Sequence, residues 1–291
     1  MSEKYTGTGF APAHITGFFE IHNHKDMQYK GSTGCGLVFD QGVEADLQAG
    51  DTLKRTRVFL NGSPVQVDAI NTAIEMLTDL PVAVNIKTNM PLGCGLGLSG
   101  AGALSVAYAL NQALSLNYTS KHLADIVHLA EVKTVSGLGD VTAQLYRGAV
   151  IRTKPGKPSN GEVDFIPSEK FIVYVVVLGN VSTKSVIGNR EMVDRINSAG
   201  GKAHSLTLKH PTIDNFMEQS KNFTMETGLL KDRAKDLIEA VEFSGGKASQ
   251  AMIGDTVFAI SDEKTKNEVY KSMLEFGEVL ELNSGTGCYT I

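Results

Sequence analysis

The residue types best suited to chemistry gather in one glycine-rich stretch, Pro91-Leu-Gly-Cys-Gly-Leu-Gly-Leu-Ser-Gly-Ala101. Five glycines between Gly93 and Gly102 permit left-handed backbone conformations and let a ligand approach the main chain closely. The apolar run that follows predicts a buried helix from Ser99 to Leu116. Because the first N–H groups of a helix lack partners within it and carry partial positive charge, this loop and helix predict a phosphate site.

Other interpretations of the glycine-rich loop fit the flanking sequence less well. The G-x-G-x-x-G dinucleotide fingerprint is present, but it requires a strand with a terminal acidic residue about 20 residues later, where a second helix is predicted here. A Walker-type loop ends in Gly-Lys-Ser/Thr, and no lysine lies between Lys87 and Lys121. A turn without a ligand, placed before a core helix, stays open for this stretch taken alone.

Two carboxylates follow the predicted buried helix. A second helix is predicted from Ser120 to about Val132, and His128 and Glu131 project from one face of it because they are three residues apart. Taken alone, Glu131 also fits a solvated helix face. Asp140 opens a short predicted helix, where an acidic residue is common as a cap or in the first turn.

Strands that would position these groups are marked by β-branched runs and glycine-containing turns. In the first half these runs are 37–39, 43–47, 58–60 and 82–87, with a helix over 69–77 and a strand over 10–20 that breaks at Pro12 and Gly17. The second half predicts strands over 171–178 and 257–260, helices between 188 and 242 and over 263–276, and two closing strands. We therefore expect an α+β fold of two lobes, residues 1–160 and 161–291, with mainly antiparallel sheets packed with helices.

The composition excludes several classes of protein. The chain has 291 residues, a net charge of −5 and 42% hydrophobic residues, which suits an ordinary globular protein and argues against a nucleic-acid-binding surface. It has no apolar run long enough to cross a membrane and no apolar signal peptide near Met1, so we expect a cytoplasmic protein without a membrane partner. Cys35, Cys94 and Cys288 support neither a disulfide framework nor a zinc site.

The glycine-rich stretch resembles the phosphate motif P-x-x-x-G-L-G-S-S-A of the GHMP small-molecule kinases, and Leu98 and Gly100 stand where the family has serine and alanine. The resemblance implies that ATP and Mg²⁺ are cofactors and that the fold is GHMP-kinase-like. It places ATP against Pro91, Gly93, Gly95, Leu96, Gly97, Leu98, Ser99, Gly100 and Ala101.

The segment Phe10-Ala-Pro-Ala-His-Ile-Thr-Gly-Phe-Phe-Glu20 resembles the first GHMP motif in the form found in archaeal-type pantoate kinases, with Ala13 where glycine is usual. This resemblance implies phosphorylation of pantoate to 4-phosphopantoate on the way to coenzyme A. His14 would then lie at the acceptor site, and the alternative is a histidine paired with backbone at the edge of the core. Ser32 would also face the acceptor, or belong to a plain turn.

The resemblance also implies roles for the polar residues that follow. Asp140, in Ser136-Gly-Leu-Gly-Asp140, would accept the hydroxyl proton, while Ser99 and Glu131 would hold Mg²⁺. Arg152 is our first candidate for binding the substrate carboxylate, and Arg147 is the second. His128 would assist at the acceptor site.

Two rival functions remain open at the level of sequence. The first is a GHMP kinase for another alcohol, such as mevalonate, shikimate or homoserine, and the second is a non-catalytic anion-binding protein. Ser249 to Gly254 occupies the place of a third family motif but keeps few of its glycines, so it assigns no residue role in the second lobe. A homodimer is left open, because the sequence does not determine the state of assembly.

Overall fold

The computed structural model describes residues 4–179, 189–252 and 254–284. The strands are β1 (Tyr5–His22), β2 (Gly31–Ala49), β3 (Arg57–Leu60), β4 (Ser63–Pro64), β5 (Val82–Lys87), β6 (Gly148–Lys154), β7 (Glu162–Ile166), β8 (Ile172–Gly179), β9 (Lys247–Gln250), β10 (Asp255–Ile260) and β11 (Val279–Asn283). The helices are α1 (Asp68–Leu77), α2 (Leu98–Ala113), α3 (Ser120–Thr134), α4 (Asp140–Ala143), α6 (Arg190–Lys209), α7 (Ile213–Thr227), α8 (Asp232–Phe243) and α9 (Lys266–Leu274).

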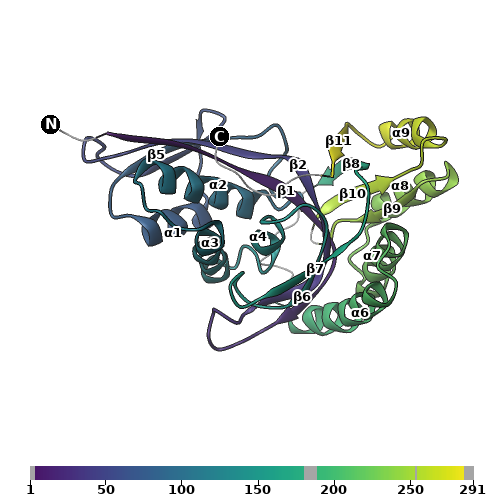
Figure 1. The fold of residues 1–291 in the computed structure, drawn as a ribbon. Helices are drawn as coiled ribbons and strands as arrows, with labels where there is room; N and C mark the ends of the chain where they lie inside the picture. Colours follow the sequence, from purple (N-terminus) through teal and green to yellow (C-terminus); the bar gives the residue numbers. More distant parts are fainter. Residues whose placement is uncertain (1–3, 180–188, 253, 285–291) are drawn as a thin grey trace.

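Strands β1 and β2 form a long antiparallel hairpin, which is the central structural element of the molecule (Figure 1). The predicted breaks at Pro12 and Gly17 do not interrupt β1. They appear instead as shifts of register against β2, between Pro12 and His14 and between Thr16 and Phe18. Irregularities of this kind bend a strand and re-aim its side chains, and these two flank His14 and Thr16.

The first sheet has seven strands in the order β4-β3-β5-β2-β6-β7, with β1 paired to β2. Among the strand pairs described in this sheet, only β3–β5 is parallel. Helix α2 packs along the hairpin so closely that a Cβ at Gly7 would lie 2.1 Å from the Ala109 carbonyl oxygen. Every residue of α2 from Leu98 to Leu110 except Ser99 is buried, which confirms the predicted buried helix.

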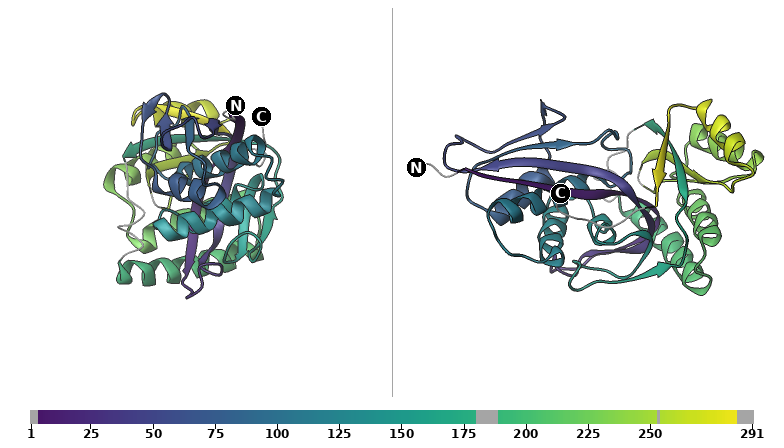
Figure 2. Two further views of the ribbon diagram at one scale, coloured as in Figure 1. Left: turned by 90° about the vertical axis from the view of Figure 1, so that its left-hand side faces the viewer. Right: turned by 45° about the horizontal axis from the view of Figure 1, so that its top comes forward.

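The second sheet is antiparallel, in the order β11-β8-β10-β9. It lies with α6 to α9 at one end of the molecule (Figure 2). Helices α6 and α7 pack against the end of the hairpin, where the rings of Phe18, Phe216 and Phe258 follow one another with centroids 6.1 Å apart. Residues from both sheets therefore share one hydrophobic core.

The α+β class with mainly antiparallel sheets is confirmed. Several local predictions differ from the structure: the runs 37–39 and 43–47 belong to one strand, β2, and β9 was not predicted. The predicted lobe boundary at residue 160 falls in the turn between β6 and β7, and both strands lie in the first sheet. Cys288 and the last predicted strand lie outside the described residues. Among the helices described, none has the length and apolar character needed to span a membrane.

Candidate active site

The glycine-rich loop adopts the backbone conformation that its sequence predicts. Gly93, Gly95 and Gly97 have positive φ angles of 77°, 90° and 63°. Gly97 is the N-cap residue of α2, and a Cβ there would lie 3.1 Å from both the His14 carbonyl oxygen and the Gln144 amide nitrogen. The loop thus turns directly into the amino end of a buried helix, which is the arrangement that favours an anion.

A pocket opens between this loop and the two helices that carry the predicted acidic residues. Ser99 at the start of α2, Glu131 near the end of α3 and Asp140 at the start of α4 all line it. The tertiary structure therefore brings together the three residues for which the sequence predicted catalytic or metal-binding roles. Thr16, Ser136 and Met252 also line the pocket, although sequence reasoning did not single them out.

Glu131 is buried, with 1% of its surface exposed, so it does not belong to a solvated helix face. Its Oε2 atom has no hydrogen-bond partner among the described residues. Glycines leave room beside it: a Cβ at Gly137 would lie 2.5 Å from Oε2, and one at Gly100 would lie 3.2 Å away. Burial, together with the nearby charge of Asp140, raises the pKa of Glu131 to about 8, against an opposing hydrogen bond from Ser136.

This environment fits a hard divalent cation such as Mg²⁺. The buried Oε2 atom of Glu131, which has no hydrogen-bond partner in the described parts of the chain, shares the pocket with Ser99 and with a loop suited to phosphate. Mg²⁺ typically takes one or two carboxylates and completes its shell with water and substrate phosphates. Within the described part of the chain, no cluster of three or more His, Cys, Asp or Glu side chains could hold a metal by protein ligands alone.

Two side chains of β1 form hydrogen bonds with Asp140. Its Oδ1 atom accepts hydrogen bonds from His14 Nδ1 at 2.9 Å and from Thr16 Oγ1 at 3.3 Å. Burial opposes ionisation of Asp140, but the His14 hydrogen bond and the positive charge of Arg152 outweigh it and hold the pKa below its usual value. A quarter of the side chain stays exposed, so an ionised carboxylate faces the pocket.

His14 links Asp140 to the glycine-rich loop. Its ring is fully buried, and burial lowers its pKa despite the contact with Asp140. The Nδ1 atom therefore carries the proton of a neutral ring. The backbone N–H of His14 donates to the Leu96 carbonyl at 3.0 Å, and a Cβ at Gly36 would lie 2.3 Å from Nε2. The histidine thus pairs with Asp140, and its backbone anchors the loop.

Arg152 and Ser32 lie beside the loop that carries Asp140. A Cβ at Gly139 would lie 2.3 Å from Ser32 Oγ and 2.7 Å from Arg152 Nε. Arg152 is 2% exposed, so it is not a surface residue at a strand end, and its Nε and Nη1 atoms have no hydrogen-bond partner among the described residues. Arg147 is exposed and lines a different surface, together with Phe165 and Lys170.

His128 occupies a structural contact. Its Nε2 atom lies 2.9 Å from the Lys30 carbonyl, and since a carbonyl only accepts, Nε2 carries the proton. Burial lowers the pKa of the ring. The contact ties α3 to the segment just before Ser32, whereas no hydrogen bond joins His128 to Asp140 or Arg152 in the described structure.

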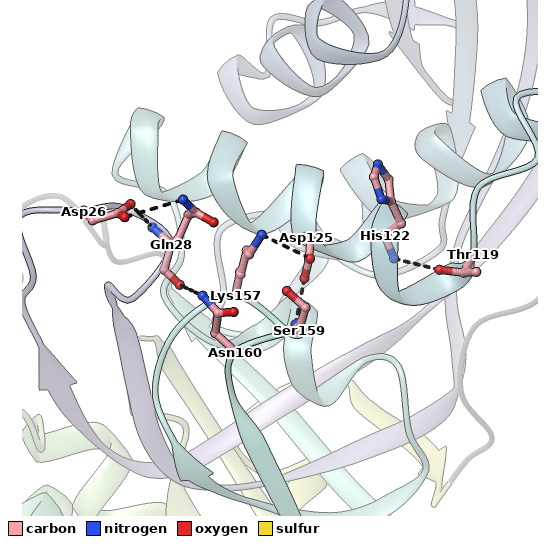
Figure 3. Close-up of polar contacts among 8 residues, drawn as sticks. All are labelled: Asp26, Gln28, Thr119, His122, Asp125, Lys157, Ser159 and Asn160. Carbon is pink, nitrogen blue, oxygen red and sulfur yellow. Dashed lines mark hydrogen bonds and ion pairs between the residues drawn. The ribbon is translucent and has the colours of Figure 1, made fainter.

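A polar network next to His128 was not expected from the sequence (Figure 3). Asp125, one turn earlier on α3, accepts from the Ser159 N–H at 2.8 Å and pairs with Lys157 Nζ at 3.5 Å. The side chain of Asn160 and the backbone N–H of Lys157 both donate to the Gln28 carbonyl, at 3.3 and 3.0 Å. These contacts hold the β1–β2 and β6–β7 turns against α3, and no local pattern in the sequence marks them.

Cys94 has the character of a packing residue. It is buried, its Sγ atom donates to the Pro91 carbonyl at 2.9 Å, and burial raises its pKa. A thiol held in its protonated form is a poor nucleophile.

The pKa of Glu131 leads to a prediction for stability without divalent cations. The folded state binds the carboxyl proton of Glu131 more tightly than the unfolded state does, so protonation of Glu131 stabilises the fold. This stabilisation is fully present below about pH 4 and is lost as the pH rises to about 8. We expect the free energy of unfolding to fall by up to about 1.4 kcal/mol per pH unit in this range. Chemical denaturation at several pH values between 5 and 8 measures this change in the free energy of unfolding. The Glu131→Gln variant should lack this component, and an unchanged slope in that variant would contradict the assignment.

The chain is similar to known proteins in both sequence and fold. Residues 66–148 match the model of the GHMP kinases N terminal domain, and residues 203–279 match that of the GHMP kinases C terminal. The chain is 36% identical to the pantoate kinase of Methanocaldococcus jannaschii over 88% of this chain and 93% of the relative. It is 27% identical to the homoserine kinase of Methanococcus vannielii over 72% of each. A solved structure described as a phosphotransferase related to the CoA biosynthesis pathway superimposes with a TM-score of 0.89, at 28% identity and 98% coverage of both chains.

Proposed function

The chain belongs to the GHMP kinase family, and on that premise we propose that it transfers the γ-phosphoryl group of ATP to pantoate, giving 4-phosphopantoate for coenzyme A biosynthesis. The observation that carries the choice of a carboxylate-bearing acceptor is the buried Arg152, whose guanidinium lies beside Gly139 and whose Nε and Nη1 atoms have no partner in the described parts of the chain. Similarity to pantoate kinases favours pantoate among such acceptors. A carboxylate and a hydroxyl on one small molecule match Arg152 and Asp140. Pantoate has both.

The donor side of the proposed reaction uses the glycine-rich loop and the amino end of α2. Their backbone N–H groups and the helix dipole stabilise the negative charge of the triphosphate. Ser99 and Glu131 would hold Mg²⁺, which when bound neutralises charge that develops on the phosphoryl oxygens. The raised pKa of Glu131 means that cation binding would displace its proton near neutral pH.

On the acceptor side, Arg152 binds the pantoate carboxylate and Asp140 accepts the proton of the attacking hydroxyl. The lowered pKa of Asp140 keeps it ionised at neutral pH, so it receives the proton without first losing one. Phosphoryl transfer depends mainly on positioning and on charge stabilisation, so a weak base held in the correct place is sufficient. His14 and Thr16 hold it there by hydrogen bonds to Oδ1. Ser32, packed beside Arg152, lies where its hydroxyl could contact the same acceptor.

A panel of acceptors tests this proposal. We expect ADP release and phosphopantoate formation with pantoate and Mg-ATP, and no transfer to pantothenate or β-alanine. Homoserine is the second candidate, because it also carries a carboxylate and a primary hydroxyl and because homoserine kinases are among the relatives. Turnover of pantothenate or homoserine at the rate of pantoate would reject the proposal. Absence of any ADP release would favour a non-catalytic anion-binding protein.

We further propose that the protein needs no nucleic acid or membrane as a partner and works in the cytoplasm. The net charge of −5 argues against a nucleic-acid-binding surface. Small anionic ligands need only a local site of positive potential. Size-exclusion chromatography with light scattering would show whether it forms a homodimer.

A further inference from the structure

The carbonyl groups of the glycine-rich loop are held by donors that lie outside the loop. The Cys94 carbonyl accepts from Thr256 Oγ1 at 2.6 Å, and the Leu96 carbonyl accepts from the His14 N–H at 3.0 Å. The Gly97 carbonyl accepts from Gln144 Nε2 at 2.9 Å. These donors come from three separate parts of the fold: β10, β1 and the end of α4.

Holding a carbonyl also sets the direction of the next N–H group. In a trans peptide the C=O and N–H bonds point in opposite directions across a rigid plane. When the Cys94 and Leu96 oxygens are bound from outside, the N–H groups of Gly95 and Gly97 are directed the other way. Both glycines line the pocket. A loop free to turn these peptides over would present carbonyl oxygens, which repel an anion.

Thr256 is the donor that the second sheet contributes. It is fully buried, and its hydroxyl reaches a residue 162 positions earlier in the chain. Gly254 allows the approach, because a Cβ there would lie 2.3 Å from the Cys94 oxygen and 3.0 Å from Gly95 Cα. The Thr256 carbonyl in turn accepts from the Ala251 N–H at 2.8 Å, so the threonine is itself held in place.

We propose that Thr256 is a positioning residue for ATP: by binding the Cys94 carbonyl it keeps the Gly95 N–H directed at the phosphates. The role rests on the proposed function only in taking the bound anion to be the phosphate chain of ATP. Thr256 touches no substrate, and its effect passes through one peptide plane of the loop. Through Thr256, which lies on β10, the second sheet contributes to the proposed nucleotide site.

The test compares two substitutions at this position. Thr256→Val keeps the shape and removes the hydroxyl, whereas Thr256→Ser keeps the hydroxyl. We expect Thr256→Val to raise KM for ATP, and the Kd of a non-hydrolysable ATP analogue, about tenfold, because one oriented donor to the phosphates is lost. KM for pantoate should stay within about twofold, and Thr256→Ser should restore ATP binding.

Thr227→Val is the matched control. Thr227 is also fully buried in the second half of the chain, and its Oγ1 donates to a backbone carbonyl, that of Phe223, at 2.8 Å within α7. This variant should lose about as much thermal stability as Thr256→Val, but its affinity for ATP should not fall. Should Thr256→Val not fold, Thr256→Ala, which also removes the hydroxyl, would be measured in the same way.

Three results would overturn the role of Thr256: normal ATP affinity in Thr256→Val, equal weakening in Thr227→Val, or no recovery in Thr256→Ser. Failure of the proposed function would look different. In that case the parent protein would bind the ATP analogue but transfer no phosphoryl group to pantoate, and the effect of Thr256 on analogue binding would still be measurable by calorimetry.

Discussion

Replacing Asp140 by asparagine should lower kcat for pantoate phosphorylation about 10²- to 10⁴-fold, with the affinity for ATP nearly unchanged. Asparagine keeps the shape of the side chain, and its Oδ1 atom can still accept from His14 and Thr16, so the fold should persist. What is lost is the negative charge and the capacity to take the hydroxyl proton. Steady-state kinetics with pantoate and calorimetry with an ATP analogue measure the two parts separately.

The matched control for Asp140 is Asp232→Asn. Asp232 is also the first residue of a helix, α8, but it lies on the surface and does not line the pocket. If Asp140 acted only in the first turn of α4, the two substitutions would have similar small effects on stability and neither would change kcat. A folded Asp140→Asn variant with near-normal kcat would reject the catalytic role.

Removing the Arg152 guanidinium should cost roughly 2 kcal/mol or more, about a 30-fold loss in kcat/KM for pantoate. The reason is that Arg152→Ala leaves the substrate carboxylate without a partner inside a buried site. Arg152→Lys should recover only part of the loss, since an ammonium cannot make the planar two-point contact of a guanidinium. KM for ATP should stay within about twofold, because the proposed site for the phosphates is the glycine-rich loop and does not include Arg152.

Arg147→Ala serves as the control for Arg152, because Arg147 directly precedes β6 but is exposed. Thermal unfolding of each variant separates lost binding from lost stability, and Arg152→Lys retains the buried charge if the alanine variant does not fold. Unchanged KM for pantoate in Arg152→Ala would remove this residue from the acceptor site. Loss of pantoate binding in Arg147→Ala would assign the contact to Arg147 instead.

Local features of the chain were predictable because they depend on neighbours in sequence. The apolar run after the glycine-rich stretch produced α2, and Thr119 caps α3 by accepting from the His122 N–H at 3.2 Å. Glycines at positions 93, 95 and 97 adopt positive φ, which other residue types rarely tolerate. Helix periodicity and glycine conformation are properties of short segments, so the sequence is enough to infer them.

Predictions of strand ends were less accurate, because pairing partners decide where a strand continues. Pro12 and Gly17 suggested breaks in β1, but β2 pairs along nearly the whole length of β1 and converts both positions into register shifts. Strand β9 has only four residues and depends on its pairing with β10. No propensity of such a short segment could have predicted it.

The sequence by itself determined the glycine-rich loop and the buried helix behind it, because glycine spacing and helical periodicity are local. The resemblance to the GHMP kinase motifs then made Ser99, Glu131 and Asp140 candidates. Only the tertiary structure decided how the pKa values of Glu131 and Asp140 are shifted. Glu131 has its pKa raised because it is buried next to Asp140, and Asp140 has its pKa lowered because β1 brings His14 to it across 126 positions of sequence. Burial and charge act through space, so they follow from packing and not from order along the chain.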